Sequence, residues 1–162
     1  MHDNPDIPIN GRSECRDAAK SLILGALNDI SLITQRLESE LYDDSDIYEY
    51  LSRLAARNRN ATIRIIAHDT RPAANRGHRL IHLAQNLPSF AQIRVTRLPD
   101  QRRFRESWLI VDQGAYLRMR NLERFEGYYK LDNKLNCRDL RKSFLEFWEA
   151  CEPDQNTRRL SL

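Results

Sequence analysis

The stretch Arg105-Glu-Ser-Trp-Leu-Ile-Val-Asp112, followed by Gln113-Gly-Ala-Tyr-Leu-Arg-Met-Arg-Asn121, decides the fold. The apolar run before Asp112 predicts a β strand, and Gln113-Gly114 predicts a tight turn. Residues 115–120 then predict a second strand. The C-terminal half of the chain is therefore expected to contain a β hairpin.

Outward from this hairpin, helical and strand patterns alternate along the chain. Apolar residues at helical spacing predict four helices, over residues 13–28, 45–57, 73–87 and 138–150. Runs rich in β-branched residues predict strands over residues 30–34, 61–68 and 92–98, with a short strand at 128–129. Ser13 and either Ser45 or Asp46 are the expected N-caps of the first two helices. Residues 38–46 and 99–103 are expected to be loops.

This order predicts an α/β fold with a layered, mixed and mainly parallel sheet flanked by helices. We expect residues 1–12 to form a flexible lead-in and residues 13–162 to form a single domain. The second helix is expected to bury Ile47, Tyr50, Leu51 and Leu54, and the last helix to bury Leu140, Phe144, Leu145, Phe147 and Trp148.

Charge is distributed unevenly along the 162 residues. Residues 1–50 carry 4 Lys or Arg against 11 Asp or Glu, whereas residues 51–162 carry 22 against 12. Arginine, whose planar fork suits phosphate and carboxylate groups, accounts for 22 of the 26 basic residues. The arginine excess and the uneven charge have three possible explanations. They reflect the base composition of the genome, they form an anion-binding face on the C-terminal two-thirds of the chain, or they allow the acidic and basic portions of the chain to self-associate.

Other compositional features narrow the class of protein. Cys15, Cys137 and Cys151 form no Cys-x-x-Cys pair, and their odd number argues against a disulfide framework. No apolar run is long enough to span a membrane, and the first residues lack the pattern of a signal peptide. We expect a cytoplasmic protein of bacterial type with no cofactor.

The hairpin region resembles the signature of the phospholipase D superfamily, His-x-Lys-x-x-x-x-Asp. When Asp112 takes the aspartate position, Arg105 stands in place of the histidine and Ser107 in place of the lysine. Met119-Arg120 takes the position of the family's Gly-Ser, and Asn121 lies about one residue before its asparagine. The resemblance covers the element order of residues 15–150 and implies one half of a phospholipase D-like domain.

The same resemblance argues against the family's chemistry. In active members one histidine attacks phosphorus, a second acts as the general acid, and lysines neutralise the phosphate. Arginine at position 105 can neither attack nor transfer a proton at neutral pH, and Ser107 carries no charge. The chain is therefore expected to be a pseudoenzyme with no catalytic residues. Because active members need two halves, the resemblance also implies a homodimer that meets near the hairpin.

A closer resemblance is to a proteobacterial phospholipase D-like domain of unknown function, often found C-terminal to a GNAT acetyltransferase domain. It is carried by the Asp112 hairpin together with His78-Arg-Leu-Ile-His-Leu83, Ile93-Arg-Val95, Phe144-Leu-Glu-Phe-Trp148 and Arg158-Arg-Leu-Ser-Leu162. This resemblance implies an acetyltransferase as a partner. The terminal leucines suggest that the tail is docked.

Arginines near the hairpin are the candidate anion-binding residues. Period-two alternation places Arg118 and Arg120 on one strand face, and ligands of α/β sheets collect at the carboxyl ends of strands. The full set is Arg79, Arg94, Arg105, Arg118 and Arg120. The alternative is that they pair as surface ions with Asp112, Glu106, Glu123 and Glu126.

Histidines and aromatic residues supply the remaining candidates. His78 and His82 stand four apart on an expected helix, and His68 ends the preceding strand; no metal site is predicted from them. Tyr128 and Tyr129 are candidates for stacking on single-stranded nucleic acid. Cys137 lies near an expected helix start, but the sequence identifies no base beside it.

Three functions remain open from the sequence. The first is an inactive binding or scaffold module that recognises an anionic ligand, nucleic acid or a protein partner through an arginine-rich face. The second is a residual phosphodiesterase that uses His68, His78 or His82. The third is a structural partner of an acetyltransferase.

Overall fold

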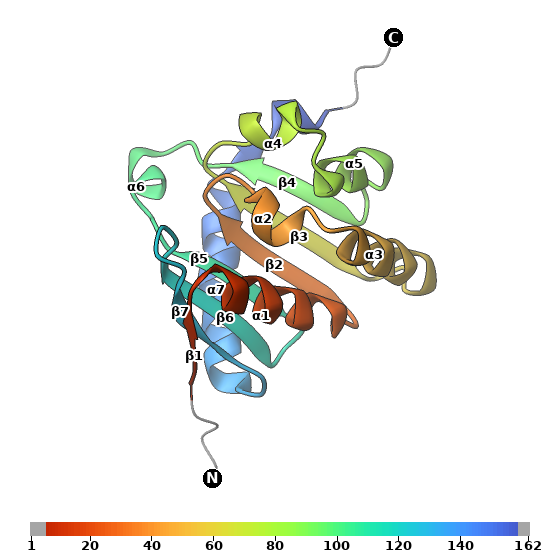
Figure 1. Cartoon of the computed structure of the whole chain (residues 1–162). Helices are drawn as coiled ribbons and strands as arrows, with labels where there is room; N and C mark the ends of the chain where they lie inside the picture. The colour runs from red at the N-terminus through yellow and green to blue at the C-terminus, as the bar shows by residue number, and fades with distance from the viewer. Residues whose placement is uncertain (1–5, 159–162) are drawn as a thin grey trace.

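A computed structural model describes residues 6–158 of the chain. One eight-stranded sheet lies at its centre, and helices cover both faces (Figure 1). The strands are β1 (Ile7–Asn10), β2 (Asp29–Thr34), β3 (Thr62–Ala67), β4 (Ala91–Val95), β5 (Ser107–Val111), β6 (Ala115–Asn121), β7 (Glu126–Lys130) and β8 (Glu152–Pro153). The helices are α1 (Arg12–Leu24), α2 (Ser39–Tyr42), α3 (Ser45–Arg57), α4 (Arg71–Asn75), α5 (Arg79–Asn86), α6 (Pro99–Arg102) and α7 (Lys134–Glu149), with a 3₁₀ turn η1 (Gln155–Thr157).

The strand order in the sheet is β1-β7-β6-β5-β2-β3-β4-β8. The mixed α/β class expected from the sequence is therefore confirmed, and β5 and β6 form the expected antiparallel hairpin. Parallel pairing is confined to β2 with β3 and β3 with β4, whereas the other five ladders are antiparallel. The expected mainly parallel balance is wrong because β5 pairs antiparallel with β2 and continues into the antiparallel strands β6 and β7, and because β1 and β8 add antiparallel ladders at the two edges.

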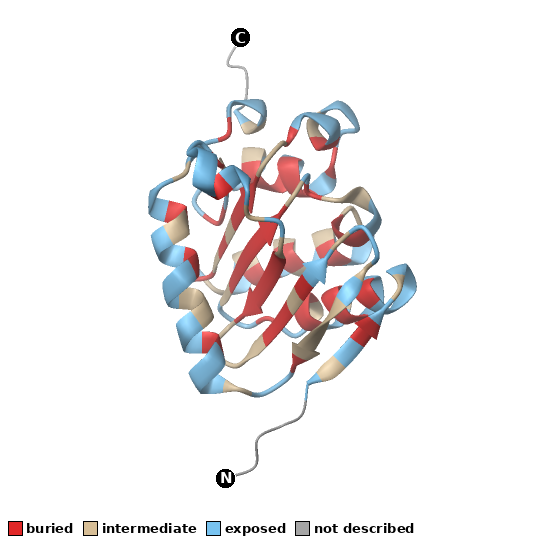
Figure 2. Cartoon of the chain, turned by 90° about the vertical axis from the view of Figure 1, so that its left-hand side faces the viewer, coloured by how far each residue is buried: buried red, intermediate tan, exposed pale blue. Residues whose placement is uncertain are grey.

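Two apolar layers lie on either side of the sheet. α1, α3 and α5 cover one face, and α7 crosses the other face, so β2 and β5 are buried on both sides (Figure 2). Leu109 and Val111 of β5 join the first layer, and Trp108 and Ile110 join the layer under α7. α7 buries Phe144 and Trp148 as expected, but Leu145 is 40% exposed because it lies on the outer side of the helix.

Several local expectations are corrected by the structure. Asp44, not Ser45 or Asp46, caps α3, because its carboxylate accepts hydrogen bonds from the Asp46 and Ile47 amides. The helix expected over residues 73–87 is broken into α4 and α5 at Gly77, which has a φ of +67°. Tyr50 is only partly buried, and its hydroxyl donates to the carbonyl of Ala26.

The segments expected to be irregular also contain regular structure. Residues 7–10 of the expected flexible lead-in form β1, which pairs with β7 through four residue positions. The two expected loops contain the short helices α2 and α6. The expected docking of Leu160 and Leu162 falls outside the described residues. No helix among the described residues is long and apolar enough to cross a membrane.

Candidate functional site

Three of the five predicted anion-binding arginines are held by partners within the fold. Arg79 lies at the start of α5, and its Nη1 is 3.0 Å from Asp43 Oδ1. Arg94 on β4 donates to the carbonyl of Trp148 at 2.9 Å and stacks over its ring. Arg118 forms a two-pronged ion pair with Glu106, with atoms 2.7 and 3.2 Å apart. These three side chains do not converge on one site.

The other two predicted arginines, Arg105 and Arg120, line one hollow of about 620 Å³. We call it the arginine hollow. Its full lining is Arg12, Gln35, Arg36, Glu38, Glu40, Arg105, Arg120, Asn121, Leu122, Glu123 and Phe125. Arg12 and Glu40 form an ion pair across the hollow's edge at 2.8 Å.

Strand ends create this hollow. β2 ends at Thr34, so the chain turns at Gln35 and Arg36 at the carboxyl end of a central strand. β5 begins two residues after Arg105, and its antiparallel partner β6 ends at Asn121. Because β2 pairs with β5 and β5 with β6, these three ends meet at one edge of the sheet. This is the edge at which α/β sheets collect ligands.

The polar groups of the hollow are ordered by local hydrogen bonds. Glu38 accepts from the hydroxyl of Thr34 and from the backbone N–H of Arg36, so its carboxylate is held at the floor of the turn. Arg105 donates to the side-chain oxygen of Gln35 at 3.2 Å. Among the described residues, Arg36, Arg105 and Arg120 form no ion pair. Arg120 places its guanidinium 5.6 Å from the centre of the Tyr128 ring. The charges of all three exposed guanidinium groups are therefore not neutralised by a carboxylate of the described chain.

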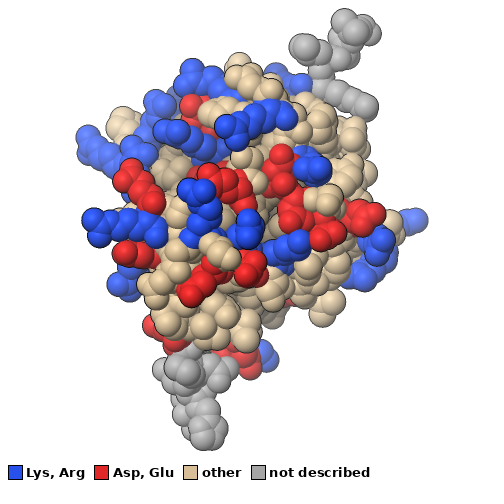
Figure 3. All heavy atoms as spheres, viewed as in Figure 1, with Lys and Arg blue, Asp and Glu red and all other residues tan. Residues whose placement is uncertain are grey.

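Charges of both signs are mixed on the molecular face above α1, α2 and α3 (Figure 3). The lining of the hollow reflects this mixture, with four arginines and three glutamates. Such a composition favours a ligand that offers both acceptors for the arginines and donors for the glutamates.

The positions of the phospholipase D motif separate along the hairpin. Arg105 and Asn121 both line the arginine hollow. Ser107 is buried on β5, and its hydroxyl has no hydrogen-bond partner within the described chain.

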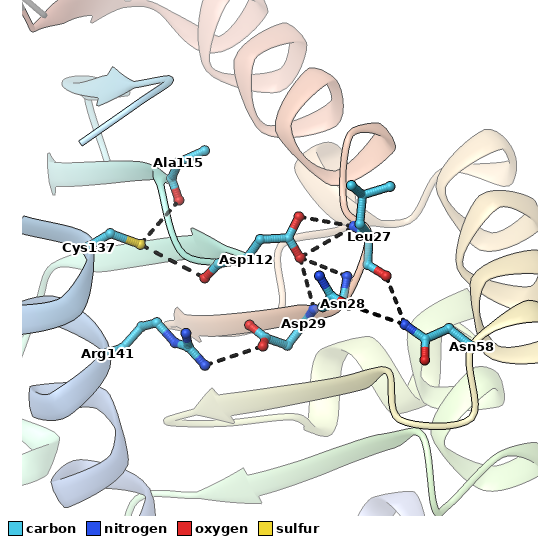
Figure 4. Close-up of polar contacts among 8 residues, drawn as sticks. All are labelled: Leu27, Asn28, Asp29, Asn58, Asp112, Ala115, Cys137 and Arg141. Carbon is cyan, nitrogen blue, oxygen red and sulfur yellow. Dashed lines mark hydrogen bonds and ion pairs between the residues drawn. The ribbon is translucent and has the colours of Figure 1, made fainter. Parts of the chain in front are cut away.

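Asp112 lies at the opposite end of β5 and acts as an anchor. Its carboxylate accepts hydrogen bonds from the backbone N–H groups of Leu27, Asn28 and Asp29 at 2.8 to 3.0 Å (Figure 4). Its own φ is +54°, a conformation that aspartate tolerates better than most residues. The motif aspartate therefore fixes the α1–β2 connection and takes no part in the hollow.

The histidines do not form a catalytic pair in this structure. His78 is fully buried as the N-cap of α5, and its Nδ1 accepts from the Leu80 amide. His68 contacts the Thr96 hydroxyl at 2.9 Å and the Phe104 carbonyl at 2.7 Å through its two ring nitrogens. Burial, with the nearby charges of Arg105 and Arg102, lowers the pKa of His68. His82 is exposed on α5, beyond the His78 cap.

Cysteines and tyrosines also occupy structural positions. Burial raises the pKa of Cys15 to about 12 and that of Cys137 to about 11, so both thiols stay protonated at neutral pH. Tyr128 and Tyr129 project to opposite faces of the sheet, with Tyr128 in the layer under α7 and Tyr129 in the other layer. They do not form a shared stacking platform. Within residues 6–158, no cluster of three His, Cys, Asp or Glu residues is arranged to hold a metal ion.

Sequence reasoning missed half of the hollow. Arg36, Gln35 and Glu38 come from the turn after β2, and Arg12 comes from the start of α1. The available signal was that Gln35-Arg36 directly follows a predicted buried strand. Glu38 was expected only to belong to the loop of residues 38–46.

The sequence profile of the family described as a domain of unknown function, DUF7931, matches residues 11–160. The chain belongs to this family. No curated protein matches its sequence.

Solved structures share the fold of this DUF7931 chain at low sequence identity. TrmBL2, an archaeal chromatin protein whose structure shows a novel mode of DNA binding, is 14% identical with a TM-score of 0.67, over 93% of this chain and 54% of the TrmBL2 chain. NucT from Helicobacter pylori is 15% identical with a TM-score of 0.61, over 93% of this chain and 99% of its own. Nuc, a phospholipase D family member from Salmonella typhimurium, is 11% identical with a TM-score of 0.58, over 86% and 90% of the two chains. The DUF7931 chain thus has a phospholipase D-like fold, and it spans about half of the TrmBL2 chain.

Proposed function

We propose that this DUF7931 domain is a non-enzymatic binding module that holds a phosphate-bearing ligand in the arginine hollow. One observation carries the proposal: Arg105, just before β5, and Arg120, near the end of β6, line the same hollow together with Arg36. Two or more guanidinium groups that face one cavity can bind a phosphate through charge-assisted, two-pronged hydrogen bonds.

The chemistry of the same hollow supports binding rather than hydrolysis. Arginine at position 105 stays protonated at neutral pH and cannot attack phosphorus. The charge of Arg105 is one of those that lower the pKa of His68. Both ring nitrogens of His68 make contacts within the fold. Its lowered pKa keeps the ring neutral near pH 7, which makes it a poor general acid.

The DNA binding of TrmBL2 is consistent with nucleic acid as the source of the phosphate. A homodimer and an acetyltransferase partner remain predictions from the sequence resemblance. A residual phosphodiesterase is the competing function, and it requires at least one of the three histidines to be essential.

Calorimetric titration with pyrophosphate and with the diester thymidylyl-thymidine tests the binding. Substitution of Arg105→Gln with Arg120→Gln should weaken binding at least tenfold because it removes two of the three unpaired cations. The control is Arg53→Gln on α3. The Arg53 side chain is 75% exposed, and its ion pair with Glu49 is long, at 3.9 Å. Equal affinity in the double variant and the control would overturn the proposal.

A hydrolysis assay separates the competing function. With bis-p-nitrophenyl phosphate as the probe, we expect the rate to equal that of the protein-free solution. Hydrolysis that is lost in His68→Ala, His78→Ala or His82→Ala would establish the phosphodiesterase instead.

A further inference from the structure

A second basic surface lies on the outer side of α7, on the sheet face opposite to α1 and α3. Lys134, Arg138, Arg141, Lys142 and Leu145 of this helix, with Gln113 of the hairpin turn, line a hollow of about 490 Å³. We call it the α7 groove. Its cations recur at positions i, i+4, i+7 and i+8, which places them on one side of the helix.

The charge of the α7 groove has one sign. None of the six lining residues is acidic, in contrast to the three glutamates of the arginine hollow. Arg141 pairs with Asp29 at 3.2 Å (Figure 4). Within the described part of the chain, Lys134, Arg138 and Lys142 form no ion pair, so three cations of the groove are not neutralised by the fold.

This arrangement is unfavourable for the helix itself. Lys134 lies in the first turn of α7, which contains no acidic residue, so its charge opposes the positive end of the helix dipole. Arg138 stands four residues from both Lys134 and Lys142, and like charges at that spacing destabilise a helix. Lys142 also has opposite charges at helical spacing, because Asp139 precedes it by three residues and Glu146 follows it by four. The unfavourable contacts are therefore those of Lys134 and Arg138, and their retention indicates a role outside the fold.

The length of the groove distinguishes between kinds of anion. From Lys134 to Lys142 the helix rises by about 12 Å, so the cations form a line rather than a ring around one point. A line of cations matches a chain of phosphates better than one small anion. The Gln113 amide adds a donor and an acceptor, and Leu145 is the one apolar lining residue, too little for an apolar partner surface.

We propose that the α7 groove binds the phosphate backbone of a nucleic acid strand without sequence preference. The groove lies beside the hairpin turn, whereas the arginine hollow lies at the other end of β5, about 17 Å away for a strand of this length. The two sites are therefore separate, and the α7 groove does not depend on the function proposed for the hollow.

Fluorescence anisotropy with a labelled 20-nucleotide single strand and a 20-base-pair duplex tests the proposal, across a series of salt concentrations. The variant is Arg138→Gln with Lys142→Gln, which keeps helix propensity and removes two charges. The matched control is Arg16→Gln with Arg53→Gln, which removes two exposed charges from α1 and α3. Circular dichroism confirms that both proteins are folded.

The groove variant should bind the single strand at least fivefold more weakly than the control at 150 mM salt. Its slope of log affinity against log salt should fall by about 1.4, the value for two lost phosphate contacts. Equal binding by variant and control would overturn the proposal. Stronger binding of the wild-type protein to polyglutamate or to phosphatidylserine vesicles than to the oligonucleotides, at equal salt, would overturn it as well.

Discussion

Arg94 lies on β4 with its guanidinium 4.3 Å from the centre of the Trp148 ring and with Nη1 bonded to the carbonyl of the same residue. It therefore joins β4 to the C-terminal end of α7. Arg118 similarly joins Glu106 to the Trp108 ring. Both were predicted from the sequence as anion-binding residues, and both have partners that occupy their donors.

Replacement of Arg94 by alanine should therefore affect stability and leave phosphate binding unchanged. Loss of the cation–π contact and of one hydrogen bond should lower the free energy of unfolding by about 1 to 3 kcal/mol. Urea denaturation followed by tryptophan fluorescence measures the change. Arg97→Ala, an exposed arginine two residues beyond β4, is the control and should change stability by less than about 0.5 kcal/mol. An Arg94→Ala protein of normal stability but reduced pyrophosphate affinity would contradict this assignment.

His78 predicts a pH dependence of stability. Burial lowers its pKa to about 4, although the neighbouring carboxylate of Asp43 acts in the opposite direction. Because the unfolded chain binds the proton near pH 6.5 and the folded chain does not, acidification from pH 6.5 to 4 favours unfolding. This single group should lower the free energy of unfolding by about 3 kcal/mol across that window.

His78→Asn tests this dependence because asparagine can also cap α5 without titrating. The loss of stability between pH 6.5 and 4 should be smaller in His78→Asn than in the wild type, as measured by urea denaturation at each pH. His82→Asn changes an exposed histidine on the same helix and should keep the wild-type slope. Identical slopes in all three proteins would show that His78 titrates normally.

At the scale of single residues, the sequence indicated three members of the hollow, Arg105, Arg120 and Asn121, through their positions in a known motif and in the hairpin. It could not tell Arg105 from Arg94, because the partner of Arg94 lies 54 residues away in the sequence. Such a contact depends on where the C-terminal end of α7 lies relative to β4 in the folded chain. Local sequence patterns do not contain that information.

Gly127 controls the pairing of β7 with β6. A Cβ atom at this position would lie 2.7 Å from Met119 Sδ and 2.8 Å from Met119 Cα, and nearer still to the carbonyl oxygen of Arg118. The contact is with backbone, so it cannot be relieved by a change of rotamer. The pairing of β6 with β7 also shifts register between Met119 and Asn121.

Gly127→Ala should therefore separate β7 from β6 and lower the free energy of unfolding by about 3 kcal/mol or more. β1 should loosen with it, because its sheet partner is β7. Gly114→Ala is the matched control, since its Cβ would meet only the Asp132 carboxylate at 3.6 Å. Thermal unfolding by circular dichroism gives the comparison, and equal midpoints for the two variants would contradict the close approach.

At the scale of elements, the sequence predicted the main helices and the central strands because their apolar periodicity is strong. It missed β1 because Pro5 and Pro8 suggested an irregular segment, although Pro8 is compatible with an edge strand. It joined α4 to α5 because the residues on both sides of Gly77 keep helical spacing. The antiparallel pairing of β1 and β8 could not be predicted either, because the partner strand of each lies far away in the sequence.

Across the whole molecule, the acidic N-terminal third is largely neutralised within the fold. Lys20 pairs with both Asp44 and Asp46, and Arg79 pairs with Asp43. The uneven charge of the two halves of the sequence therefore becomes a set of internal ion pairs on the α1–α3 face. Among the described residues, the cations that form no ion pair include Arg36, Arg105 and Arg120 of the arginine hollow and Lys134, Arg138 and Lys142 of the α7 groove.

The DUF7931 chain shares a phospholipase D-like fold with Nuc at 11% identity. From the sequence, the motif resemblance predicted the fold and directed attention to the hairpin, without indicating at which of its ends the hollow lies. The other wall of the hollow required the structure, because it is built from the turn after β2.

Chemical-shift mapping of the ¹⁵N-labelled protein during titration with pyrophosphate tests directly whether the arginine hollow binds phosphate. We predict that the shifted backbone amides cluster at residues 35–38, 105–106 and 120–123, around the arginine hollow. Shifts centred on His68, His78 and His82, or an absence of saturable shifts at residues 105 and 120, would contradict phosphate binding in the arginine hollow.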